Sequence, residues 1–372
     1  MSDTLSRPAS SGVATVDVTR DARAPGALPS WSGWAVAGAA LVVGIAFPFV
    51  FSNPAITTIA VFTLIFVTCA TAWNLFAGYS GYIALGNAVF YGSGAYTVAN
   101  ITADTHMKGG SLVFLLLPAA GLVGALVAVP VGWLALRTRR HTFVVITIAI
   151  FFIFQLLAYN LTGITNGSAG MSLPIPTSWG PVSFNDHFYF VGLALAVVAV
   201  AVSWGVRRSR FGLDLLAIKD DEDRARGLGV ATGRVKLGAF MVTGLLTGMA
   251  GGLYAYFVGS IYPPFVFDAL FDVSIALMSF TGGLGTVAGP VVGAVVLEPL
   301  QQYFTLKFSA DGAYLIAYGI LFLLIMQFLP QGVLPSAARY LKRRALRRNE
   351  AQPGPVTPSP EPAVTSTPDP KA

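Results

Sequence analysis

Long apolar stretches alternate with short polar ones along most of this chain. A helix needs about 20 apolar residues to cross the hydrocarbon core of a bilayer. We therefore predict membrane-spanning helices at residues 33–51, 56–77, 82–102, 111–136, 142–158, 187–206, 237–258, 272–283, 287–305 and 312–330. The fold class is an all-α, polytopic membrane helix bundle of nine or ten transmembrane segments. The number depends on whether the short piece 272–283 crosses the membrane or re-enters it.

The polar pattern divides the chain into a membrane domain and two tails. Residues 1–32 show no sustained apolar period, and residues 331–372 are first basic and then proline-rich, so we expect both tails to be disordered. The membrane domain is 33–330, and its only well-charged interior stretch is the island 207–236. The first apolar run is too long for the core of a signal peptide, so we expect it to be retained.

Composition and charge support a membrane protein and set its orientation. Of 372 residues, 55% are hydrophobic and only 11% charged, which is not a soluble globular balance. The net charge of +6 does not indicate nucleic-acid binding, because the basic residues flank apolar runs. If both tails, Arg137–Arg140 and the island face the cytoplasm, only Lys108 and Lys307 of the 23 basic residues lie outside. This arrangement requires 272–283 to cross, which makes ten crossings.

The island contains a short charged helix. Acidic residues crowd its start at 220–223, Arg224 and Arg226 lie in its last turn, and Gly227 supplies a stop. Pairs Asp220–Arg224 and Glu222–Arg226 add a little stability.

Ahead of this helix, Leu213, Leu216 and Ala217 share one helical face, with Leu215 and Ile218 beside it, which indicates a segment that packs against something. The island is either a docking element for a soluble partner or a solvated connector resting on the protein's own helix ends.

Two glycine-dense stretches interrupt the apolar pattern in opposite halves of the chain. Glycine in a membrane helix permits close helix contact or a backbone break that lines a cavity. The residues that we assign to a translocation path or gate are Asn74, Gly78, Gly81, Gly86, Asn87, Tyr91, Gly282, Gly283 and Gly285. Simple close packing is the alternative. The paired interruptions are also a weak indication of an internal repeat around a central site.

The chain offers little chemistry of its own. Cys69 lies inside an apolar run and is interpreted as core, and Glu298 is interpreted as lying near a helix end at the outer interface. We expect no catalytic, cofactor-binding or metal-binding residues, because no metal cluster, paired carboxylates or nucleophile with a base at usable spacing is visible. No G-x-x-x-x-G-K-[ST] motif occurs, so ATP hydrolysis is not expected here.

Three stretches carry a resemblance to a known family. Gly78–Tyr96, Ser209–Glu222 and Gly282–Gly293 resemble the signature stretches of branched-chain amino-acid ABC transporter permeases of the LivM type. The resemblance implies that the island engages ATP-binding subunits through Gly212, Asp221, Glu222, Gly227 and Gly229. Many relatives have His where this chain has Asn87, and we would expect Gly at position 164, where this chain has Ile.

The resemblance also implies partners and a location in the cell (inner) membrane. These partners are a second, similar permease subunit, two ATP-binding subunits that carry ATP and Mg, and an extracytoplasmic solute-binding protein, with membrane lipid around the bundle. The function implied is import of a branched-chain amino acid, although the family extends to urea and short amides and the sequence does not fix the solute. A rival from another class is a self-sufficient, ion-coupled secondary transporter, which needs ionisable residues within its spans.

Overall fold

The computed structural model describes residues 30–51, 53–176 and 179–307, with isolated positions between 316 and 336. The helices of the first half are α1 (Ser30–Val50), α2 (Pro54–Ser80), α3 (Ala88–Asp104), the 3-10 helix η1 (Ser111–Leu116), α4 (Leu117–Ala135), α5 (Arg140–Asn160), α6 (Thr162–Thr165) and the 3-10 helix η2 (Gly167–Ala169). Those of the second half are α7 (Pro181–Arg208), α8 (Arg210–Asp220), α9 (Glu222–Gly227), α10 (Thr232–Val258), α11 (Pro263–Val266), α12 (Ala269–Gly282) and α13 (Gly289–Lys307).

The prediction of an all-α membrane bundle is confirmed. Within the described ranges, six helical stretches are long and apolar enough to cross a bilayer: Pro54–Ser80, Ser111–Ala135, Arg140–Asn160, Ser183–Arg208, Thr232–Val258 and Pro263–Gly282. Helices α1, α3 and α13 also stand where spans were predicted. The count of ten stays a prediction, because residues 312–330 lie largely outside the described residues, as do 1–29 and most of 331–372.

The chain divides into two units at Gly44–Ile45, inside α1. In the first unit the structure describes the α1 residues up to Gly44, an apolar helix whose described side chains include the exposed Leu41 and Val42. Helices α2 to α13 and both strands belong to the second unit.

Local signals in the sequence explain where the helices begin and end. The Asn53 side chain caps α2 by accepting a hydrogen bond from the Ala55 N–H at 3.0 Å, and Pro54 occupies the first turn. Gly81 ends α2 with φ of 74°, a left-handed conformation that glycine adopts without strain. Asp268 caps α12 through the Leu270 N–H at 3.0 Å. The piece predicted at 272–283 therefore begins earlier, at Ala269.

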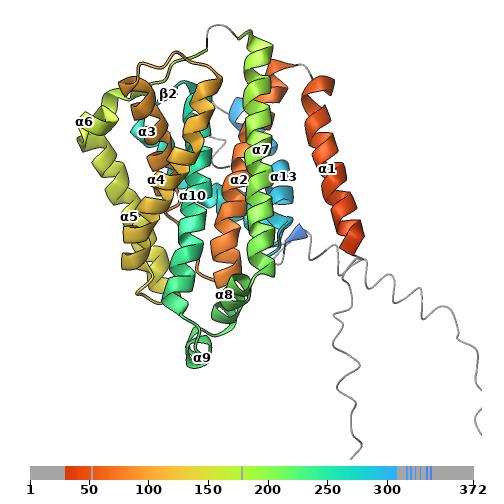
Figure 1. The fold of residues 1–372 in the computed structure, drawn as a ribbon, viewed down its shortest axis with the longest axis vertical. Helices are drawn as coiled ribbons and strands as arrows, with labels where there is room; N and C mark the ends of the chain where they lie inside the picture. Colours follow the sequence, from red (N-terminus) through yellow and green to blue (C-terminus); the bar gives the residue numbers. More distant parts are fainter. Residues whose placement is uncertain are drawn as a thin grey trace, which may run out of the picture. The chain divides into compact units, whose positions relative to one another are not determined.

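Helix α10 lies at the centre of the bundle and packs against α4, α3 and α2 (Figure 1). Its contacts with α4 run through glycine: a Cβ added to Gly244 would lie 2.7 Å from the Gly124 carbonyl oxygen, and one added to Gly248 would lie 2.7 Å from that of Ala120. Such distances show that the two backbones touch without intervening side chains, as small residues allow in membranes.

Apolar side chains cover the outer surface of the bundle as well as its core. Leu126 of α4 is 65% exposed, and Phe152 and Leu156 of α5 are 54% and 65% exposed. An apolar outer surface on long helices is what contact with lipid requires.

The end of the bundle opposite α8 and α9 carries the only strands of the described residues, β1 (Met171–Ser172) and β2 (Ser260–Ile261) (Figure 1). They pair antiparallel, and the Leu173 N–H donates to the Gly259 carbonyl at 2.8 Å. The chain between α5 and α7 is thus tied to the chain that follows α10. Position 164, where glycine was expected, is an exposed isoleucine in α6.

Candidate functional site

The island folds as two helices rather than one. Ser209 caps α8 by accepting from the Gly212 N–H at 3.2 Å, and Gly212 lies so close to the Val206 carbonyl that a side chain there would collide with the end of α7. Asp221 then interrupts the helix and caps α9 through the Arg224 N–H at 3.0 Å. Because of this break, Arg224 pairs with Asp221 at 3.8 Å, and the predicted pair with Asp220 is wrong.

The apolar face of α8 differs from the predicted one. Leu215 and Ile218 are completely buried, whereas Leu213 is 62% exposed. Sequence periodicity does not fix which of two adjacent apolar stripes meets the bundle, and here α8 turns the 215/218 stripe inward. Arg140 of α5 holds the end of α8, donating to the carbonyl oxygens of Ile218 at 2.8 Å and Lys219 at 2.6 Å. The basic stretch Arg137–Arg140 and the island therefore lie at the same end of the bundle.

Glu222 faces inward and forms the centre of a polar network. Its carboxylate lies 2.7 Å from the ammonium of Lys236 in α10 and 3.2 Å from the guanidinium of Arg226, and it accepts a hydrogen bond from the Tyr82 hydroxyl. Burial alone would raise the pKa of Glu222, but the hydrogen bonds from Lys236 and Tyr82 outweigh it and lower that pKa below its ordinary value.

Lys236 is the buried cation of this network, with its side chain 3% exposed. Its ammonium lies 3.2 Å from the Tyr82 hydroxyl oxygen and 4.4 Å from the centre of the Tyr82 ring. The sequence assigned no role to Tyr82 or Lys236. A lysine directly before the apolar span predicted at 237–258 was the available signal.

The tip of the island carries the remaining predicted coupling residues. Gly227 ends α9 and Gly229 follows in a turn, and a side chain added to either would meet open space. Leu228 between them is 80% exposed, the largest exposed fraction among the large hydrophobic residues that the structure describes. Figure 1 shows α9 projecting from the end of the bundle beyond α8 and α10.

The two glycine-dense stretches meet directly. Asn74 of α2 donates to the Thr286 carbonyl at 2.8 Å and accepts from the Gly285 N–H at 2.7 Å, so its amide clasps the turn between α12 and α13. A Cβ added to Gly78 would lie 2.9 Å from the Gly285 nitrogen, so α2 can approach this turn only through glycine.

The island also contacts this junction. The Lys219 ammonium donates to the Gly78 carbonyl at 2.9 Å, and Arg207 donates to the Gly285 carbonyl. Burial lowers the pKa of Lys219. All three resembling stretches therefore come together at one end of the bundle. Gly282 and Gly283 lie just before the turn, and the Gly282 Cα is in contact with the Gly289 backbone, which closes the α12–α13 hairpin.

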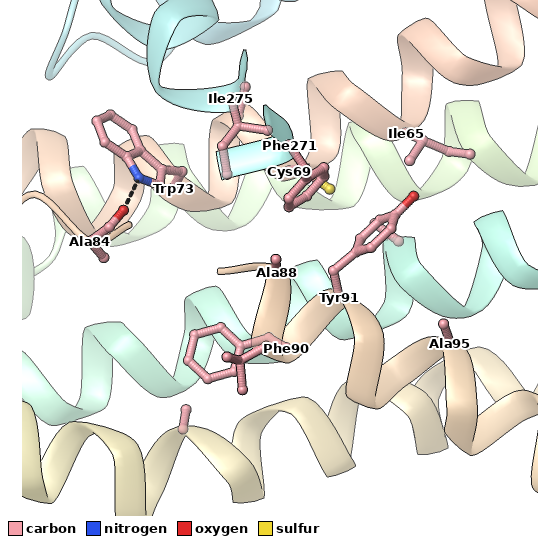
Figure 2. Packing of buried hydrophobic residues seen from close by; sticks show 14 of the residues in the cluster. Ile65, Cys69, Trp73, Ala84, Ala88, Phe90, Tyr91, Ala95, Phe271 and Ile275 are labelled. Carbon is pink, nitrogen blue, oxygen red and sulfur yellow. Dashed lines mark hydrogen bonds between the residues drawn. The ribbon is translucent and has the colours of Figure 1, made fainter. Parts of the chain in front are cut away.

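Helix α3 begins inside the bundle. After α2 ends, the chain returns along it, and the Trp73 indole N–H donates to the Ala84 carbonyl at 2.8 Å. Trp73 lies about two turns, or about 10 Å of helix rise, before the end of α2, so by Ala84 the chain has turned back into the bundle. Figure 2 shows Ala88 and Tyr91 across from Cys69 and Phe271 in the middle of the core.

A buried acid caps this interior helix end. The Asp272 carboxylate accepts from the Asn87 N–H at 2.8 Å and the Ala88 N–H at 3.4 Å, and Asp272 is 2% exposed. The Asn87 side-chain oxygen is buried with no hydrogen-bond partner among the described residues. Gly86 lies against α5, where a Cβ would lie 2.6 Å from the Thr147 carbonyl oxygen.

Glu298 is completely buried in the middle of α13, so its predicted place near a helix end at the outer interface is wrong. One carboxylate oxygen accepts from Gln302 at 2.9 Å, and the other has no partner in the described part of the chain. The apolar surroundings were visible in the sequence, but the proline that follows does not end the helix, as a proline within a membrane helix need not.

The described residues contain no group of three metal-ligating side chains. The predicted path residues fall into two places, Asn74, Gly78 and Gly285 at the clasp and Asn87 and Tyr91 at the interior start of α3. Whether they line the path of a solute stays a prediction.

The long apolar helices, the apolar outer surface and the charged island at one end define a polytopic membrane protein. Residues 55–326 match the family model described as branched-chain amino acid transport system / permease component, and the chain belongs to that family.

Relatives of known name support this assignment. The chain is 30% identical to the high-affinity branched-chain amino acid transport system permease protein LivM of Salmonella typhimurium, over 82% of this chain and 76% of the relative. It is 26% identical to LivH of Escherichia coli, over 71% of this chain and 89% of the relative. A shorter match, 32% identical over 30% of this chain and 35% of the relative, is to the autoinducer 2 import system permease protein LsrC of Photorhabdus luminescens. No solved structure matches the chain.

Proposed function

We propose that the chain is a permease subunit of an ABC importer that carries branched-chain amino acids into the cell. In this proposal it lies in the cytoplasmic membrane beside a second, similar permease, and two separate ATP-binding subunits hydrolyse ATP. An extracytoplasmic solute-binding protein delivers the solute. The names of the LivM and LivH relatives support the solute class and the second permease.

The single observation that carries the proposal is the exposed tip of the island. Leu228 is 80% exposed and Leu213 is 62% exposed on a segment that projects from the bundle and is otherwise charged. Around them the side chains of Asp223 and Arg224 are 85% and 80% exposed. An apolar side chain presented among charges of both signs suits a soluble protein surface better than lipid. The occupant that we propose is the ATP-binding subunit.

The orientation follows from the same end of the molecule. Arg140 contacts the end of α8, so the basic cluster before α5 and the island share a face. Cytoplasmic loops are enriched in Lys and Arg. We propose that this face, and with it both tails, is cytoplasmic, and that the β1–β2 end faces the solute-binding protein.

The test compares two equivalent changes at opposite ends of the bundle. Leu228→Asp should cause the ATP-binding subunits to dissociate during purification of the complex, because it places a charge in the apolar centre of the contact. Ile164→Asp alters an isoleucine that is 57% exposed in the loop near β1, and it should leave those subunits bound. Retention of the ATP-binding subunits at wild-type stoichiometry by Leu228→Asp would contradict the proposal.

A second candidate function is a self-sufficient, ion-coupled transporter, and the buried acids favour it. Asp272 and Glu298 are both ionisable groups inside the bundle, as ion coupling requires. Against it, the two oxygens of Asp272 already accept backbone N–H groups. Uptake of leucine by the chain alone, reconstituted in vesicles with a proton or sodium gradient, would establish this function. Uptake of urea and acetamide by the complete transporter with ATP tests the related solutes of the ABC permease family.

A further inference from the structure

We propose that the 81–87 segment transmits movement of α9 to the interior end of α3, with Tyr82 as the positioning residue that joins them. The inference rests on the proposed function, since it assumes that an ATP-binding subunit moves α9. It adds the route by which that movement reaches the interior of the permease. Tyr82 and Lys236 were not among the residues assigned a role by the sequence.

The start of the segment, at Tyr82, is hydrogen-bonded to the island. The Tyr82 hydroxyl donates to Glu222, the first residue of α9, and lies 3.2 Å from the Lys236 ammonium. Lys236 in turn binds Glu222 at 2.7 Å, so α9, α10 and the segment meet at one carboxylate. With Lys236 almost completely buried, these bonds are little weakened by solvent or salt.

The later part of the segment, at Ala84 and Asn87, is hydrogen-bonded to the core of the bundle. The Ala84 carbonyl accepts from Trp73, and the Asn87 N–H donates to Asp272 (Figure 2 shows the first bond). Between Tyr82 and Asn87 there are only four residues, and Tyr82, Ala84 and Asn87 are each held. Because the segment is short and hydrogen-bonded at these three residues, its length can change little. A displacement of Glu222 therefore displaces the start of α3.

Other contacts at this end do not provide the same route. Lys219 and Arg207 bind backbone carbonyls at the α2–α13 junction, those of Gly78 and Gly285, and neither of these carbonyls belongs to the 81–87 segment. Arg140 binds the end of α8 and approaches the Tyr82 ring only at 5.9 Å from its centre. Tyr82 is therefore the one side chain of the described residues that bonds the first residue of α9 from the segment that leads into α3.

The experiment removes single hydroxyl groups from the complete transporter, reconstituted in lipid nanodiscs with its ATP-binding subunits. Tyr82→Phe deletes the bond to Glu222, and Tyr79→Phe is the matched control. Tyr79 is the next-to-last residue of α2, and its hydroxyl bonds Ser203 of α7 at 2.9 Å. The measured quantity is the ATPase rate with leucine-loaded solute-binding protein divided by the rate without it. We expect Tyr82→Phe to lower this ratio about fivefold or more, with the subunits still bound, and Tyr79→Phe to leave it unchanged.

Glu222→Gln provides a second, independent variant, which also serves if Tyr82→Phe does not fold. Tyr82→Phe removes the donor of this link and Glu222→Gln removes the charge of its acceptor, so the double variant should have the same ratio as the more impaired single variant. Additive losses in the ratio, accompanied by additive losses in thermal stability, would show that the residues act only by stabilising the fold and would overturn the inference.

The inference is also overturned if Tyr82→Phe keeps the wild-type ratio, or if it releases the ATP-binding subunits, since Tyr82 would then act in docking. Failure of the proposed function gives a different result: the wild-type complex itself shows no stimulation by the solute-binding protein, and Leu228→Asp keeps its ATP-binding subunits.

Discussion

Replacing Asn74 tests whether the two glycine-dense stretches are held together by one side chain. Asn74 is completely buried, and Asn74→Ala removes both the acceptor of the Gly285 N–H and the donor to the Thr286 carbonyl. Each buried backbone group left without a partner costs about 1–3 kcal/mol. We therefore expect the free energy of unfolding to fall by roughly 2–6 kcal/mol.

Asn100→Ala is the matched control for this prediction. The Asn100 amide is half-buried and bonds only the Tyr96 carbonyl of its own helix, at 2.8 Å. That carbonyl keeps its helical partner, and alanine favours the helix, so the expected loss is below about 1 kcal/mol. The free energy of unfolding of each variant is measured by titration with a denaturing detergent.

Equal stability of Asn74→Ala and Asn100→Ala would refute the clasp. The sequence assigned Asn74 to the translocation path, and that role makes a different prediction. A residue that only lines the path should change the KM for solute uptake and leave the unfolding free energy near that of the control.

The remaining predictions concern the polar network, helix packing and the cysteine. The lowered pKa of Glu222 means that its ionised form stabilises the folded state above its ordinary pKa of about 4.3 and that this contribution is lost as the pH falls through the lower folded value. Glu222→Gln should therefore flatten the acid side of a plot of unfolding midpoint against pH. Gly251→Ala in α10 places a methyl group against the Tyr91 carbonyl and should lower the unfolding free energy by about 1–3 kcal/mol. Its control is Gly233→Ala in the same helix, where the methyl group meets open space and the change should be neutral or stabilising by up to about 1 kcal/mol. Cys69 is completely buried, so N-ethylmaleimide should modify it only after unfolding, as read by intact mass.

The sequence predicted the fold well because the length of an apolar stretch is enough to identify a membrane-spanning helix. The segments predicted at 56–77, 111–136 and 237–258 correspond to α2, η1–α4 and the inner part of α10. The sequence did not predict that the three resembling stretches meet, since nothing local in Asn74 or Gly285 indicates that the Asn74 side-chain oxygen and the Gly285 nitrogen lie 2.7 Å apart.

The details of the island were harder to predict for physical reasons. Apolar stripes 215/218 and 213/216/217 are adjacent on one helix, and only the neighbouring bundle decides which is buried. Glu222 was assigned to a docking surface through the resemblance, and the sequence did not show that it pairs with Lys236, the last residue of the island, which belongs to α10. The start of α3 was placed at residue 82 instead of 88, because apolar residues at 82–85 continue the hydrophobic pattern across a backbone break.

The carboxylate at the start of α3 has a consequence for any working cycle of the protein. Moving α12 away from α3 would leave the buried Asp272 carboxyl group and two backbone N–H groups without their hydrogen-bond partners, which is costly in an apolar core. The two helices are thus bound to travel as one body, and alternate states must be sought in how that pair slides against its neighbours.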